Sequence, residues 1–144
     1  VSLEQPSTAM AVTRGKGAEE VAGGDRTIGR MVFVPYALYR AHGFVSPHLA
    51  AQTGFDNADL DLLFEALKGM FEIDRSAARG EMASQRLFVF EHENALGNAP
   101  AHRLFDRIQV KRCDHRSPAR SVHDYEVSVD RADLPTGITL HERF

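Results

Sequence analysis

The chain contains a single cysteine, Cys113, among its 144 residues. A lone thiol excludes an internal disulfide and favours a reducing compartment. The sequence also lacks a run of the roughly 18 apolar residues that a membrane-spanning helix needs. It shows no signal peptide, which would have a charged start followed by an apolar run. We therefore expect a soluble, cytoplasmic protein that makes no contact with a membrane.

The motifs of common enzyme classes are missing too. The sequence has no GxGxxG or P-loop glycine pattern, no GxSxG, no HExxH and no cysteine pair for zinc. Of the seven histidines, His42 and His48 stand six apart across a proline, a spacing that suits neither a helix face nor a usual zinc motif. We expect no catalytic residue, no metal and no cofactor.

One segment keeps an enzymatic alternative open. The stretch "EHEN" at 91–94 sets Glu91 and Glu93 beside His92, and these groups could serve a small metal-dependent nuclease. Neighbouring residues of a strand point to opposite faces, however, so Glu91 and His92 would not face the same site.

The periodicity of the apolar residues predicts an α+β fold in one unit, 1–144. A helix is expected over 56–74, with Asp56 as its N-cap and apolar residues at helical spacing. Strands are expected over 30–45, 86–92, 107–112 and 124–130, with a last short strand at 138–140.

The N-terminal part has a different character. A strand expected at 10–14 is separated from the strand at 30–45 by a glycine-rich stretch of mixed charge. This pattern favours a long hairpin over 10–40, with a mobile tip at 15–30 that could clamp a ligand. Residues 41–144 would form the remainder of the unit.

The net charge of −3 hides an uneven distribution, which matters more than the sum. The expected helix holds a cluster of six acids: Asp56, Asp59, Asp61, Glu65, Glu72 and Asp74. Basic residues gather in two other segments, 26–42 and 102–120. An acidic helix therefore coexists with basic segments that could meet phosphates, or could meet the acidic helix of another copy in a pure protein-interaction module.

The stretch "DRSAARGEM" at 74–82 follows the expected helix and presents two arginines four residues apart, Arg75 and Arg79. Ser76 and Gly80 would let a phosphodiester approach the backbone, and the guanidinium groups would grip neighbouring phosphates. The alternatives are that Arg75 binds free carbonyls at the helix end or that Asp74 pairs with one of the arginines.

Three long strings carry a resemblance that covers the chain. They are "DRTIGRMVFVPYALYRAHGFVSPHLAAQTGF", "DLDLLFEALKGMFEIDRSAARGEMASQRLFVFEHENALGNAPAHRLFD" and "SVHDYEVSVDRADLPTGITL". Together they resemble the C-terminal part of the CRISPR-associated backbone subunit of type I-C Cascade, the Csd-two branch of the Cas-seven superfamily. Chains of that family extend further at the N-terminus, so we expect a fragment of a longer chain.

The resemblance implies part of an RRM-like (ferredoxin-like) core, with an antiparallel sheet, one main helix and a thumb-like hairpin at 10–40. It implies a non-catalytic subunit that binds CRISPR RNA and oligomerises along it in an antiviral surveillance complex. Its partners would be CRISPR RNA, target DNA through that RNA, neighbouring copies of itself and other Cascade subunits. The expected RNA contacts are Arg26, Arg30, Arg40, His42, Arg75, Ser76 and Arg79.

Overall fold

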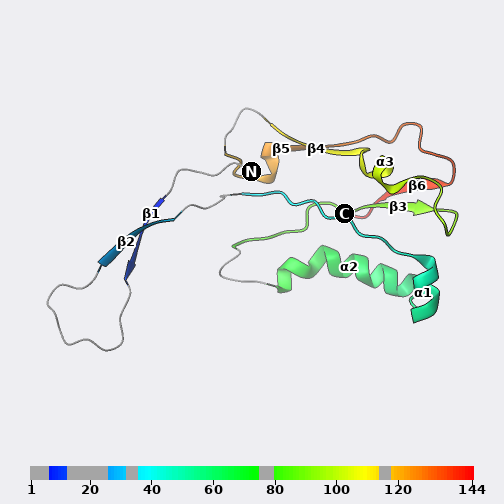
Figure 1. Cartoon of the computed structure of the whole chain (residues 1–144), viewed down its shortest axis with the longest axis horizontal. Coiled ribbons are helices and arrows are strands. Elements are labelled where there is room, and N and C mark those ends of the chain that lie inside the picture. Colours follow the sequence, from blue (N-terminus) through cyan, green and yellow to red (C-terminus); the bar gives the residue numbers. More distant parts are fainter. Residues whose placement is uncertain (1–6, 13–25, 32–35, 75–79, 114–117) are drawn as a thin grey trace. The chain divides into compact units, whose positions relative to one another are not determined.

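The computed structural model describes residues 7–12, 26–31, 36–74, 80–113 and 118–144 (Figure 1). Its regular elements are a few helices and short antiparallel strands, so the predicted α+β class is confirmed. In chain order they are β1 (Ser7–Val12), β2 (Arg26–Met31), α1 (Pro47–Thr53), α2 (Asn57–Ile73), β3 (Phe88–His92), α3 (Ala101–Phe105), β4 (Ile108–Arg112), η1 (Val122–Asp124), β5 (Tyr125–Val129) and β6 (Ile138–Glu142). None of the helices in the described part is long and apolar enough to cross a membrane.

The strands form three antiparallel pairs, β1–β2, β3–β6 and β4–β5. The chain divides into two compact units, one formed by 1–40 and 110–127 and the other by 41–109 and 128–144. The sequence-based expectation that residues 1–144 form a single unit stays a prediction.

In the first unit, β1 and β2 pair in register from Ser7 opposite Met31 to Val12 opposite Arg26. The carboxylate of Asp124 is buried, and its Oδ2 accepts hydrogen bonds from the backbone N–H groups of Arg120 at 2.7 Å and Ser121 at 3.0 Å. A buried carboxylate is stable only when it is bonded in this way. Asp124 therefore fixes the turn that leads into β5.

Helix α2 begins where the sequence predicts. The side chain of Asp56 accepts from the backbone N–H of Ala58 at 2.8 Å and of Asp59 at 3.1 Å, and the Asp59 carboxylate accepts from Asp56 N–H at 3.1 Å. This reciprocal capping box satisfies backbone donors that the first turn leaves free. The expected helix over 56–74 is confirmed as Asn57–Ile73.

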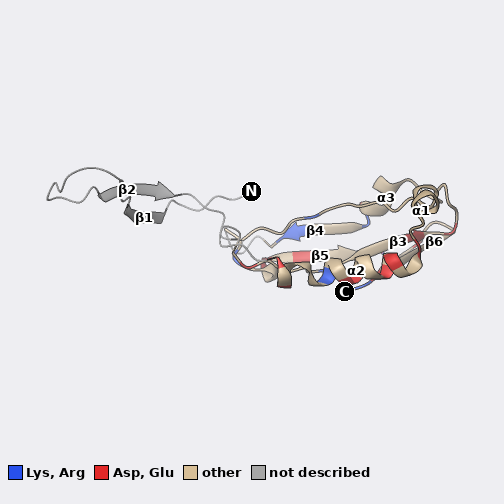
Figure 2. Cartoon of the chain, turned by 90° about the horizontal axis from the view of Figure 1, so that it is seen from below, with Lys and Arg blue, Asp and Glu red and all other residues tan. Residues whose placement is uncertain are grey.

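The second unit is organised around the β3–β6 pair, in which Phe90 lies opposite Leu140 and His92 opposite Ile138. Phe90 meets the ring of Phe105 in α3 with centroids 6.5 Å apart. Arg143, which follows the last residue of β6, stacks on Phe64 of α2, with 4.9 Å between its Cζ atom and the ring centroid. Alternate residues of a strand face opposite ways, so α3 and α2 approach the sheet from its two faces. Figures 1 and 2 show α2 running alongside these strands.

The core of this unit is small. Its buried apolar residues among the described ones are Leu104, Ile108, Ile138 and Leu140. Ile138 and Leu140 alternate with more exposed neighbours in β6, which is the pattern of a strand that buries one face.

The strand expected over 30–45 is wrong for residues 36–45. The strand in this region is β2 at Arg26–Met31, while residues 36–46 form neither helix nor strand. Proline at 35 cannot donate to a ladder, and residues 36–46 have no strand partner among the described residues. Of the expected mobile tip at 15–30, residues 26–30 lie in β2 and residues 15–25 lie outside the described part, so the tip stays a prediction.

Candidate nucleic-acid interface

The seven expected RNA contacts fall in three places. Arg26 lies in β2 opposite Val12, and Arg30 lies opposite Thr8. Arg40 and His42 lie in the irregular stretch 36–46, and both are exposed. The remaining three, Arg75, Ser76 and Arg79, are outside the described residues, so the role expected for the stretch after α2 stays a prediction.

His42 is held by stacking. Its ring lies nearly parallel to that of Phe105, with 4.0 Å between centroids and 13° between planes. Phe44 meets Phe105 edge-on at 5.6 Å, and Phe90 closes the group from β3. We call these four residues the aromatic cluster. Sequence reasoning assigned His42 a hydrogen-bonding role and missed the other three, because Phe90 and Phe105 are distant along the chain.

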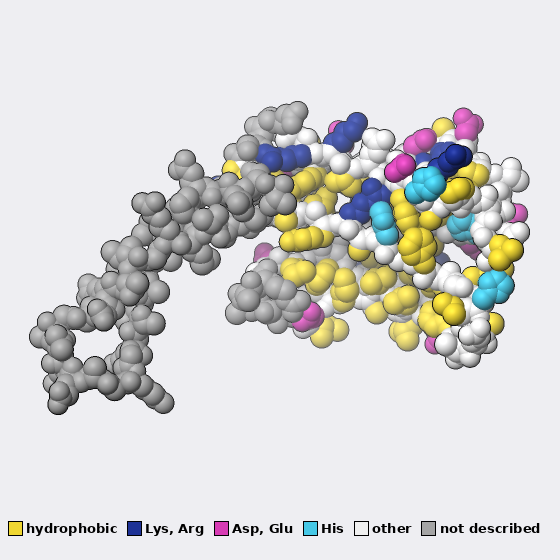
Figure 3. Space-filling view, in the orientation of Figure 1, with side chains coloured by type: hydrophobic (Ala, Val, Ile, Leu, Met, Phe, Trp, Pro, Cys, Tyr) yellow, Lys and Arg dark blue, Asp and Glu magenta, His cyan; other side chains and the backbone are white. Residues whose placement is uncertain are grey.

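The outer part of the aromatic cluster is open to solvent. His42 is exposed, and Phe44 has 76% of its surface accessible. On the face shown in Figure 3, histidine and hydrophobic side chains lie next to one another. Aromatic side chains of this kind, histidine included, stack on unpaired nucleobases without reading their identity. An unpaired nucleobase that stacked on this cluster would extend the existing stack of His42 on Phe105 by one ring.

In the basic segment 102–120, the structure assigns Arg107 a structural role. Its guanidinium donates to the carbonyl oxygens of Ala132 at 2.5 Å and Asp133 at 2.9 Å, and it pairs with Asp130 at 3.3 Å. These bonds tie the turn after β5 to the start of β4. Arg103 in α3 and Lys111 in β4 remain exposed.

Side chains of the segment 91–94 form hydrogen bonds within the fold. His141 Nε2 lies 2.8 Å from Glu91 Oε2 across the β3–β6 pair. His92 Nδ1 accepts from Asn98 N–H at 2.9 Å and so holds the following turn. Glu91 and His92 are thus directed to different partners. The described residues contain no group of three or more His, Cys, Asp or Glu that could hold a metal ion.

Tyr36 is the first residue of the irregular stretch 36–46, and it contacts Tyr125 of β5 with 6.0 Å between ring centroids. Partial burial raises the pKa of Tyr36 above its ordinary value, and the charge of Tyr125 raises it further when both ionise. Tyr36 therefore serves as a packing residue, while Tyr39 is exposed and open to stacking.

Comparison with known proteins identifies one family. The family model described as "CRISPR-associated protein Cas7" matches residues 1–130. A search of curated proteins finds no match.

Proposed function

Because the chain belongs to the Cas7 family of CRISPR-associated proteins, we propose that it is a backbone subunit of a type I-C Cascade complex that binds CRISPR RNA. The family match over residues 1–130 carries this proposal. The subunit acts by binding and assembly in the cytoplasm, without catalysis. Its partners are CRISPR RNA, target DNA paired with that RNA, neighbouring copies and other Cascade subunits.

The chemistry of the described residues is consistent with binding that ignores base identity. A subunit that must accept any guide sequence needs phosphate contacts and flat stacking surfaces rather than groups that read base edges. The aromatic cluster offers such a surface at His42. Arg40, two residues earlier, brings a positive charge to the same stretch.

The remaining proposed contacts are phosphate contacts by Arg26, Arg30, Arg75 and Arg79, with Ser76 donating to a phosphate oxygen. Arginine suits this task because its planar guanidinium can bind two phosphate oxygens at once. Arg75 and Arg79, four apart in sequence, would contact successive phosphates.

The test is a titration of labelled single-stranded RNAs of unrelated sequence, followed by fluorescence anisotropy at several salt concentrations. We expect Arg75→Ala/Arg79→Ala to weaken binding to all RNAs and to reduce the slope of log affinity against log salt by about 1.4, since each phosphate contact contributes about 0.7 on single strands. His42→Ala should weaken binding with little change in slope, because stacking releases no counterions.

Two variants serve as controls. His48→Ala removes another exposed histidine, from α1, and Arg131→Ala removes an arginine paired with Glu142 at the surface. Both should bind RNA as the unmodified chain does. Equal loss in the control and test variants, or a double arginine variant with an unchanged salt slope, would contradict the proposed contacts.

A further inference from the structure

Helix α2 carries two apolar stripes, and the β3–β6 side of the unit uses only one. The first stripe is half-buried and reaches β6 through Phe64, which lies under Arg143. It consists of Leu60, Phe64, Leu67 and Phe71. The second stripe is exposed: Leu62 is 69% and Ile73 is 89% accessible. A surface helix of a single folded domain normally has one apolar stripe, so the second indicates a contact surface.

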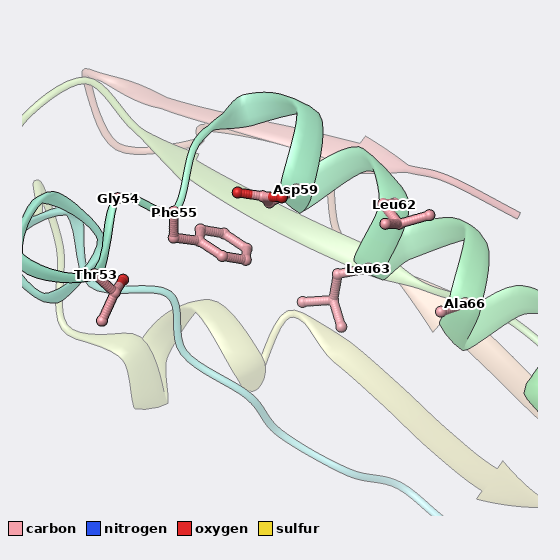
Figure 4. Close-up of a pocket in the computed structure, with 7 residues that line it drawn as sticks. All are labelled: Thr53, Gly54, Phe55, Asp59, Leu62, Leu63 and Ala66. Atoms are coloured by element: carbon pink, nitrogen blue, oxygen red, sulfur yellow. The ribbon is translucent and has the colours of Figure 1, made fainter.

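The exposed stripe is hollowed along its length. Figure 4 shows Phe55 and Leu63 directed into a hollow beside the first turns of α2. A second hollow continues past Ala66 toward the end of the helix. Together they form what we call the outer groove, lined on α2 by Leu62, Leu63, Ala66, Gly69, Met70 and Ile73. In Figure 3 hydrophobic side chains are visible along α2.

The spacing of the groove residues fits a second helix. Positions 62, 66, 69 and 73 alternate by four and three residues, which is the spacing at which one helix meets another in coiled-coil-like packing. Ala66 and Gly69 are small, and a side chain added at Gly69 would meet no atom within 4 Å. The stretch from Leu62 to Ile73 is about 17 Å long at 1.5 Å per residue, enough for about three turns of a partner helix.

The charge around the outer groove is negative. Asp59 lines the first hollow and Glu65 lines the second, and among the residues that the structure describes no lysine or arginine lines either hollow. Lys68, the one cation within α2, lies 200° around the helix from Ala66 at 100° per residue. Carboxylates repel phosphates and attract cationic side chains. This surface therefore disfavours RNA and favours a basic protein segment.

We propose that the outer groove binds an amphipathic helix of a partner protein, one whose apolar stripe is flanked by lysine and arginine. The described residues that line the groove include none of the proposed RNA contacts. A second copy fits poorly, because pairing α2 with α2 brings like charges together. The other helices that the structure describes, α1 with seven residues and α3 with five, are too short to fill three turns.

Two synthetic helical peptides test the proposal against the whole chain. They share one leucine and alanine stripe, and their flanking positions are either lysine and arginine or glutamate. By fluorescence anisotropy, we expect the basic peptide to bind at least tenfold more tightly than the acidic one. Met70→Asp should weaken that binding at least tenfold. Leu96→Asp, at a position 86% accessible in the turn after β3, should leave it unchanged.

A charge variant separates attraction from apolar contact. Glu65→Gln should weaken binding of the basic peptide several-fold and lower the salt dependence of that binding. Glu126→Gln, at an exposed acid of β5, should do neither. Circular dichroism of each variant shows that α2 has kept its helix.

Three outcomes overturn the proposal. The first is no binding of the basic peptide by the folded chain, and the second is equal binding of both peptides. The third is concentration-dependent self-association, seen by sedimentation, that Met70→Asp abolishes, which would assign the groove to a second copy. Titration of the Met70→Asp variant with RNA separates this test from that of the proposed function. Met70 is not one of the proposed RNA contacts, so the RNA affinity of this variant should equal that of the unmodified chain.

Discussion

Replacing Arg107 with alanine should destabilise the fold without removing a nucleic-acid contact. The guanidinium spans the end of the β4–β5 pair, where Asp130 N–H donates to the Arg107 carbonyl at 2.9 Å. It also bonds the carbonyl of Asp133, whose backbone has a φ of 46°. That conformation is costly for a residue other than glycine. Removing the guanidinium would leave this turn without its main side-chain support.

The magnitude follows from the individual contacts. The pair with Asp130 counts for little, because the Asp130 side chain is 59% exposed and such pairs contribute about 0–1 kcal/mol. The two bonds to carbonyl oxygens involve a charged donor, and each is typically worth about 1.5–3 kcal/mol. Since they share one side chain that is 20% exposed, we expect a total loss of about 2–4 kcal/mol in the free energy of unfolding.

Urea unfolding followed by circular dichroism measures this loss, and thermal unfolding should show Tm lowered by roughly 5–15 °C. Arg103→Ala, at an exposed arginine of α3, is the matched control and should change stability by less than about 0.5 kcal/mol. Arg107→Lys should recover only part of the loss, because an ammonium group lacks the planar fork that reaches two carbonyls. If Arg107→Ala were as stable as Arg103→Ala, the structural role assigned to this guanidinium would be refuted.

Two further predictions concern glycine and tyrosine. Gly54 ends α1 with a φ of 77°, so Gly54→Ala should cost about 1 kcal/mol of unfolding free energy, while Gly69→Ala inside α2 should add about 0.5–1 kcal/mol; urea unfolding that ranks them the other way would contradict both assignments. Tyr36 should ionise above pH 10.0 in an ultraviolet titration, with part of the increase removed by Tyr125→Phe. Because its pKa is raised in the folded state, its contribution is complete below the unfolded pKa and is lost as pH rises through the folded one.

Local signals were sufficient for most of the elements. Helix α2 could be predicted because its capping residues and apolar period lie within one continuous segment. The strands β3, β4 and β5 are likewise short alternating or apolar runs. Helix α1 was missed although Ser46, Pro47 and Gly54 are start and stop signals, because the preceding aromatic run suggested a strand. Helix α3, with five residues, is too short to show a period.

The roles of single residues were harder to predict. Arg107 belongs to a basic segment in the sequence, but its partners at 132 and 133 are brought to it by the fold. His42 meets Phe105 only because residues 41–46 pass beside α3. Contacts between distant segments depend on packing, which no short pattern encodes. The exposed stripe of α2 can be found only when accessibility separates it from the half-buried stripe.

The central claim is that copies of this chain line up along CRISPR RNA, and the stoichiometry of the complex tests it most directly. Native mass spectrometry of the chain in excess over single-stranded RNAs of increasing length counts the copies bound to each RNA. A backbone subunit predicts that the number of copies rises in proportion to RNA length, whatever the sequence. One copy per RNA at every length, or no RNA-bound species, would contradict the account.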